Sequence, residues 1–95
     1  MASNTTHVDK SKFITLTIRD RQNTIVDNEQ VFAVTSINKR GLFDILPEHE
    51  NFISIIKDKV IVHKTRKDKQ EIKIETGILE VTDNNVKIFL GLHSE

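Results

Sequence analysis

ILEVTDNNVKIFL, residues 78–90, is the stretch that decides the fold class. Two short apolar runs, ILEV and VKIFL, flank a polar loop in which Asn84 and Asn85 can adopt the positive φ angles that tight turns require. Alternation along the first run places Leu79 and Val81 on the core side. The stretch therefore predicts a β-hairpin at the end of the chain.

The same two-residue period occurs in two earlier segments. In FITLTI, residues 13–18, the isoleucines and the leucine share one face and the threonines share the other. EIKIE, residues 71–75, follows a charged loop and directs Ile72 and Ile74 inward. Both segments predict half-buried strands.

Composition supports an all-β fold throughout. Thirty of the 95 residues are Ile, Val or Thr, and only two are Ala, which is the reverse of what helix propensity favours. Polar breaks at Asp27-Asn28, at residues 57–59 and at Thr76-Gly77 divide the chain into eight to ten short strands, one of them VFAVTSI at 31–37. We therefore predict a small β-sandwich of two sheets.

Length and charge restrict the organisation and the partners. We expect a flexible N-terminal tail at residues 1–12 and a single sandwich domain at residues 13–92. Fourteen basic and fourteen acidic residues leave no net charge, which argues against a nucleic-acid binder. The chain has no cysteine, and its longest apolar runs are far too short to insert into a membrane.

Residue patterns for catalysis are weak. We find no glycine-rich phosphate loop and no nucleophile motif, and the four histidines lack the spacing of zinc ligands. Glu48 and Glu50 flank His49, but alternation directs them to the face opposite the histidine, and acidic pairs beside a proline are usually only solvated. We predict no catalytic, cofactor-binding or metal-binding residue, and a small hydrolase is the weakest of the functional readings.

Two motifs carry a family resemblance. GLFDILPEHENFISII, residues 41–56, resembles the G-E-F/L-G-I-L/Y-P-G-H-A-P-L-L stretch of the epsilon subunit of F-type ATP synthases, which is called delta in mitochondria. ETGILEVTDNNVKIFL, residues 75–90, resembles the S-G-G-F/I-L-E-V-x-x-x-x-V-T-V-L stretch of that family. The two motifs occur in the family's order and at about its separation, and the resemblance covers about residues 13–91.

The resemblance implies a fold and a function. The N-terminal domain of that subunit is a ten-stranded sandwich of two five-stranded sheets. It is a non-catalytic part of the rotor stalk, needs no cofactor, and couples the rotation of the c ring to the gamma subunit. Its place implies a bacterial-type location, as a peripheral subunit at the cytoplasmic face of the inner (plasma) membrane. The alternative is a free-standing β-sandwich, derived from this subunit, that binds another protein or a ligand.

The resemblance also implies roles for single residues. The segment from Lys39 to Phe52 would form the end that faces the c ring, and its expected contact residues are Lys39, Arg40, Gly41, Leu42 and His49. Pro47, Gly77, Leu79 and Val81 match motif positions that we expect to be structural; Gly77 is most simply a bulge or a close backbone approach.

Three departures and one absence modify these expectations. Leu42 replaces a frequent Glu, and Asp44 and Glu48 replace glycines, so we expect the loop to follow a different path because these residues lose the freedom to take positive φ. The chain stops just after the last strand, without the C-terminal helical hairpin common in bacterial and chloroplast members. We therefore expect neither inhibition by a hairpin nor a nucleotide site.

Overall fold

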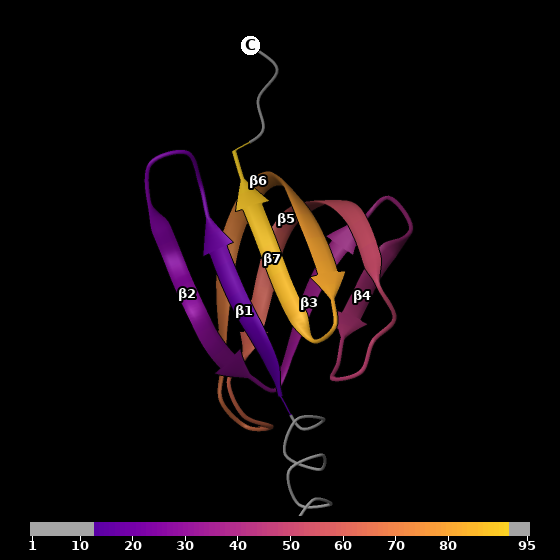
Figure 1. Cartoon of the computed structure of the whole chain (residues 1–95). Coiled ribbons are helices and arrows are strands. Elements are labelled where there is room, and N and C mark those ends of the chain that lie inside the picture. Colours follow the sequence, from indigo (N-terminus) through magenta and orange to yellow (C-terminus); the bar gives the residue numbers. More distant parts are fainter. Residues whose placement is uncertain (1–12, 92–95) are drawn as a thin grey trace, which may run out of the picture.

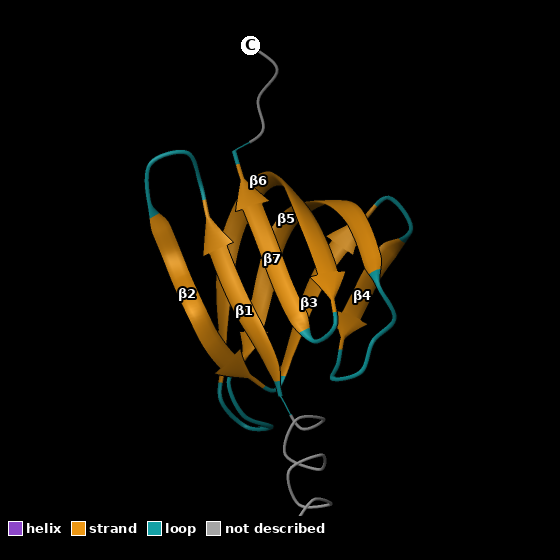
Figure 2. Ribbon diagram, viewed as in Figure 1, coloured by secondary structure: helices purple, strands orange, loops and turns teal. Residues whose placement is uncertain are grey.

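The computed structural model describes residues 13–91, and this part of the chain consists of strands and loops, with no helix (Figures 1 and 2). The strands are β1 (Ile14–Arg19), β2 (Thr24–Val31), β3 (Ala33–Asn38), β4 (Gly41–Ile45), β5 (Phe52–His63), β6 (Lys69–Thr82) and β7 (Asn85–Leu90). The all-β prediction is confirmed. The tail predicted for residues 1–12 and residue 92 lie outside the described residues.

The seven strands form one mixed sheet in the order β2-β1-β7-β6-β5-β3-β4. Only β1 and β7 run parallel; every other neighbouring pair is antiparallel. The prediction of two sheets is corrected in this respect, because β5 and β6 continue without interruption from one half of the molecule into the other (Figure 1). The first half of β5 pairs with the second half of β6, and the second half of β5 pairs with β3 and with the start of β6.

The predicted count of eight to ten short strands is wrong because three expected breaks lie inside strands. Asn28 (φ 50°) and Asp58 (φ 74°) have positive φ, and the pairing register shifts beside each of them, against β1 for Asn28 and against β3 and β6 for Asp58. Both positions are therefore β-bulges, which insert a residue without ending the strand. Thr76 and Gly77 are ordinary paired residues of β6.

One predicted strand is divided instead. The chain bends at Phe32, so that Val31 ends β2 and Ala33 begins β3, and no single strand covers residues 31–37. In β3, Val34 and Ser36 are fully buried, whereas Thr35 is only partly buried.

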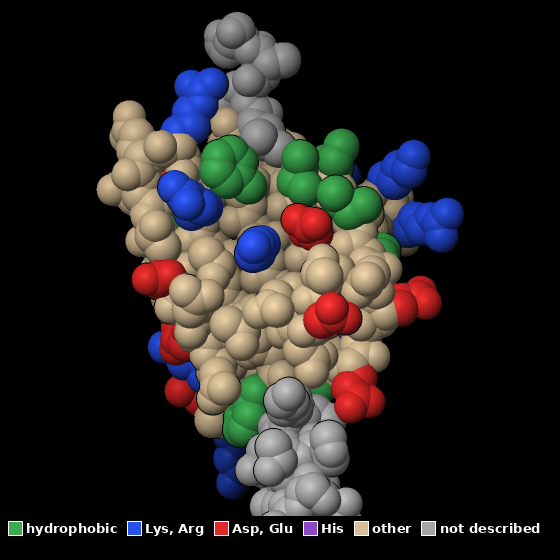
Figure 3. Space-filling model, viewed as in Figure 1, with side chains coloured by type: hydrophobic (Ala, Val, Ile, Leu, Met, Phe, Trp, Pro, Cys, Tyr) green, Lys and Arg blue, Asp and Glu red, His purple; other side chains and the backbone are tan. Residues whose placement is uncertain are grey.

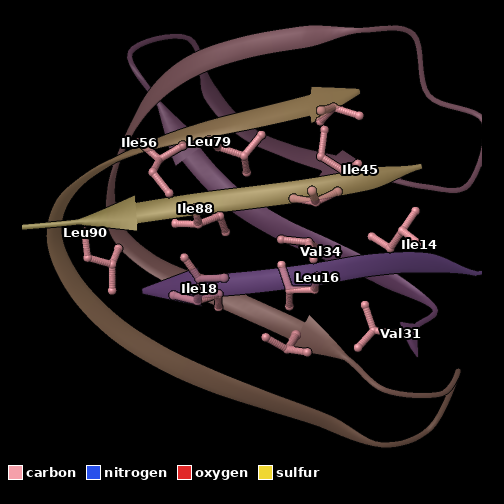
Figure 4. Packing of buried hydrophobic residues seen from close by; sticks show 14 residues of the cluster. Ile14, Leu16, Ile18, Val31, Val34, Ile45, Ile56, Leu79, Ile88 and Leu90 are labelled. Atoms are coloured by element: carbon pink, nitrogen blue, oxygen red, sulfur yellow. The ribbon is translucent and has the colours of Figure 1, made fainter. Parts of the chain in front are cut away.

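A single hydrophobic core joins the two halves of the sheet (Figure 4). Its buried members come from all seven strands: Ile14, Leu16, Ile18, Val31, Val34, Ile45, Ile56, Val60, Val62, Leu79, Val81, Val86, Ile88 and Leu90. The predicted inward faces of β1 and, in β6, of Leu79 and Val81 are confirmed, and Ile72 and Ile74 pack against the same core. The sheet therefore encloses its apolar face as a sandwich does.

Two backbone features of β6 and β7 agree closely with the motif. The turn between the strands has positive φ at Asp83 (50°) and Asn84 (66°), one residue earlier than predicted. This is the conformation of a two-residue type I′ hairpin. Gly77 is a close approach, because a Cβ atom there would lie 3.0 Å from the carbonyl oxygen of Phe89.

No helix in the described part of the chain is long and apolar enough to cross a membrane.

Candidate partner-binding surfaces

Four of the predicted contact residues lie at the turn between β3 and β4: Lys39 and Arg40 form it, and Gly41 and Leu42 begin β4. Asn38 opens the turn and its Oδ1 accepts a hydrogen bond from the backbone N–H of Arg40, 2.8 Å away. Gly41 closes the turn with φ of 119°, a conformation that side chains rarely adopt, which explains a glycine at this motif position. Lys39, Arg40 and Leu42 are exposed, so the turn presents two cations and an apolar side chain.

His49, the fifth predicted contact residue, lies in the loop between β4 and β5. Its ring packs edge-on against Phe52, with 5.5 Å between the ring centroids, and its Nδ1 lies 2.7 Å from the carbonyl oxygen of Glu50. The backbone N–H of Glu48 donates to Oδ1 of Asn84, at 2.6 Å, which ties this loop to the β6–β7 turn. The histidine is thus half-buried and held by its neighbours.

The structure does not bring the five predicted contact residues together. Lys39 and Arg40 precede β4, Gly41 and Leu42 are its first two residues, and His49 follows its last residue. The two groups therefore lie at opposite ends of the strand, at the upper right and the lower right of Figure 1. The five residues of this strand span about 13 Å at ~3.3 Å per residue. One flat partner surface at either end of β4 can therefore meet only one of the two groups.

The backbone at Glu48 corrects one expectation. Its φ is 66°, so the chain keeps the left-handed conformation although the residue is not glycine. Pro47 and Glu48 form the turn that follows β4. Asp44, at the other position where the motif has glycine, lies within β4 as an exposed strand residue. The glycine is therefore dispensable at these positions, at the cost of local strain at Glu48.

An exposed apolar stripe crosses the outer face of the sheet, and the sequence reading missed it. Ile55 of β5 pairs with Ile78 of β6, which pairs with Phe89 of β7, so these residues are cross-strand neighbours. Ile53 and Ile55 are 68% and 67% exposed. Figure 3 shows hydrophobic side chains gathered on the upper part of this face, with Lys and Arg side chains to the left and right. The sequence did contain a signal for this stripe, because the segments FISII and KIFL carry apolar residues on both faces of their strands.

A polar cluster lies on the outer side of the other half of the sheet. Thr35 donates a hydrogen bond from Oγ1 to Oδ1 of Asp44, and the same Oγ1 lies 2.8 Å from Nε2 of His63. Because the hydroxyl proton points to the carboxylate, the ring nitrogen is the donor to the hydroxyl oxygen. The chain of hydrogen bonds connects the edge strand β4 through β3 to β5. Among residues 13–91, no group of three or more His, Asp or Glu side chains could hold a metal ion.

Comparison with known proteins gives a family and two similar structures. The family model described as the beta-sandwich domain of the ATP synthase Delta/Epsilon chain matches residues 13–91. A chain in the structure of the OSCP, F1 and c-ring of the Euglena gracilis mitochondrial ATP synthase is 25% identical, with a TM-score of 0.78, over 83% of this chain and 51% of that one. No curated protein sequence matches.

A second similar structure supports the fold alone. A chain in the central stalk and c-ring of the Tetrahymena thermophila mitochondrial ATP synthase is 12% identical, with a TM-score of 0.70, over 80% of this chain and 61% of that one. The present chain therefore spans about half to three fifths of the length of these two chains. The resemblance inferred from the two motifs is confirmed over residues 13–91.

Proposed function

The chain belongs to the ATP synthase delta/epsilon family of non-catalytic stalk subunits, and we propose from this that it couples rotation of the c ring to the gamma subunit. The observation that carries the proposal is the combination of one continuous core with separate exposed surfaces. A coupling subunit must transmit torque between two partners without deforming, and a close-packed sandwich resists deformation.

The two long strands support this mechanical role. β5 and β6 pair along almost their whole length, from Phe52↔Val81 to His63↔Lys69, and they connect both halves of the sheet. A force applied at one half is therefore transmitted through backbone hydrogen bonds as well as through the core. Two separate sheets would rely on side-chain packing alone.

We assign the predicted contact residues to two surfaces. The turn at Lys39–Leu42 is the proposed contact with the c ring, because the side chains of Lys39, Arg40 and Leu42 are exposed and form no part of the core. His49, expected at the c-ring end, lies beyond the other end of β4 and is therefore tested as a separate contact. The apolar stripe on β5, β6 and β7 is the proposed contact with gamma, since exposed apolar patches mark protein interfaces.

Copurification tests the proposal. The tagged chain, expressed in its own organism, is expected to bring down gamma and the c subunits after membranes are solubilised in mild detergent. An intact, folded chain that recovers neither partner would refute the coupling role and favour the free-standing binding module. The bacterial-type location stays a prediction, and fractionation of the source cells checks it.

Substitution of single residues tests the assigned contacts. His49→Ala removes a ring that touches Phe52, so stability is measured first and assembly second. Loss of copurification at unchanged stability would establish His49 as a contact; unchanged assembly and unchanged coupled ATP synthesis would remove it. Leu42→Asp is the matching change at the turn, where 68% exposure makes an effect on folding small.

A further inference from the structure

The first half of β5 is an open strand edge beside a basic turn. Residues 52–57 pair with β6 on one side, whereas on the other side β3 reaches β5 only at Lys57 and then from Val60 onward. A cavity of about 560 Å³ follows this edge and is lined on its other side by the β3–β4 turn, including Lys39 and Arg40. Backbone groups along such an edge are a template for another strand.

We propose that this edge binds an extended segment of gamma, the partner assigned to the apolar stripe, which adds a strand beside Phe52–Ile56. The segment carries acidic residues for Lys57 and, where the gamma contact meets the turn assigned to the c ring, for Lys39 and Arg40. The proposal rests on the proposed function, because it takes the partner from the ATP synthase stalk. It goes further by stating how the partner is held: by backbone hydrogen bonds along β5, by apolar side chains beside Ile53 and Ile55, and by opposite charge.

Charge gives the first argument for this occupant. The residues that line the cavity include three cations, Lys39, Arg40 and Lys57, and no Asp or Glu. All three are exposed, and none makes an ion pair with another described residue. A segment with acidic side chains would complement these three cations.

Exposure gives the second argument. Ile53 and Ile55 point outward from β5 and are about two-thirds exposed, next to an edge that carries no charged residue before Lys57. Proteins normally protect an apolar edge by charges, by a bulge or by a covering element. In β5 the only bulge lies at Asp58, after the apolar part of the strand, residues 52–56, has ended. An added strand would cover both isoleucines by cross-strand contacts.

Other occupants fit less well. The polar side chains in the cavity already pair with one another: Nδ2 of Asn38 donates to Ser54 Oγ at 3.1 Å, and Ser54 Oγ donates to the carbonyl of Ile55 at 3.2 Å. They therefore do not converge on a small polar ligand. A flat lipid surface would touch the rim but could not reach backbone groups between the turn and β5. A docked helix would cover the isoleucines and leave the strand edge unpaired.

Amide hydrogen exchange separates these possibilities. The experiment compares the free chain with the chain in detergent-solubilised ATP synthase, by mass spectrometry of peptides that cover residues 52–57. We expect roughly half of these amides to exchange at least tenfold more slowly in the complex, because alternate N–H groups face the open edge. Unchanged exchange of these amides would overturn the proposal. A helix or a lipid that covered only the side chains would give this result, because it would leave the backbone N–H groups of the edge unpaired.

A photo-cross-linking residue at Ile55 identifies the occupant. The expected product joins this position to a partner peptide that contains Asp or Glu; cross-links to lipid, or to a peptide without acidic residues, would refute the proposal. The double variant Lys39→Glu/Arg40→Glu should weaken partner binding about tenfold. Its matched control, Lys69→Glu/Lys73→Glu, changes the same charge on the exposed start of β6 and should bind normally.

The two levels of inference can fail separately. If the wild-type chain does not copurify with stalk subunits at all, the proposed function fails. If the wild-type chain assembles but the amides of residues 52–57 keep their free exchange rates, only the strand addition fails.

Discussion

Replacement of Gly77 by alanine should destabilise the protein through one contact that cannot relax. A Cβ atom at this position would lie 3.0 Å from the carbonyl oxygen of Phe89 and 3.0 Å from Cδ2 of Leu90. The leucine methyl can turn away. The carbonyl belongs to β7, which is paired on one side with β6 and on the other with β1, so the backbone of Phe89 cannot move without disturbing two ladders.

The expected loss follows from overpacking. Inserting a methyl group into a packed site costs about 1–3 kcal/mol, and replacing glycine returns about 0.4–1 kcal/mol by restricting the unfolded chain. We expect a net loss of about 1–2 kcal/mol. For a domain of this size, that corresponds to a fall in Tm of roughly 5–15 °C.

Urea unfolding followed by far-UV circular dichroism measures the loss, because the chain has neither Trp nor Tyr for fluorescence. Thr82→Ala is the control: it places alanine at an exposed position of the same strand and should change the unfolding free energy by less than about 1 kcal/mol. A Gly77→Ala variant that unfolds at the wild-type urea concentration would show that the close approach of β6 and β7 does not require glycine.

Three further predictions concern the loops and the core. Glu48→Gly relieves a left-handed conformation and should raise the unfolding free energy by about 0.5–1 kcal/mol, whereas Glu50→Gly, at ordinary φ, should lower it by a similar amount; thermal unfolding compares the two. Backbone N–H groups of Asn23 and then Gln22 hold the pKa of Asp20 below its usual value. This stabilisation is present above the unfolded pKa of Asp20, about 3.8, and is lost as pH falls through the lower folded pKa. In acid titrations, the difference in unfolding free energy between wild type and Asp20→Asn should therefore change below about pH 4 and stay constant above about pH 5. Leu79→Ala should cost about 2–5 kcal/mol in urea unfolding because this side chain is fully buried, and a smaller loss would mean that the core collapses around it.

Local patterns predicted those parts of the fold that depend on near neighbours in the chain. The alternation in β1 placed Ile14, Leu16 and Ile18 in the core, and the alternation around Leu79 and Val81 did the same for β6. These predictions succeed because successive strand residues point to opposite faces whatever the strand pairs with. The first motif succeeds for a related reason, since Gly41 meets a local requirement for positive φ.

The positive-φ residues show where local patterns stop. Asn28 and Asp58 carry the same signal as the true turn at Asp83 and Asn84, yet they lie in β-bulges inside long strands. Whether such a residue reverses the chain or only bulges depends on whether a partner strand continues past it. Pairing partners lie far away in the sequence, so a one-residue signal could not distinguish the two outcomes.

The candidate contacts divide in the same way. From the sequence came the family, the all-β class, the turn at Lys39–Leu42 and the loop that carries His49. Only the tertiary structure showed that these two groups lie at opposite ends of β4, and that Ile53 and Ile55 face outward beside an open edge. The physical reason is that hydrophobicity decides which residues can be buried, whereas the register and curvature of the whole sheet decide which of these residues are actually buried.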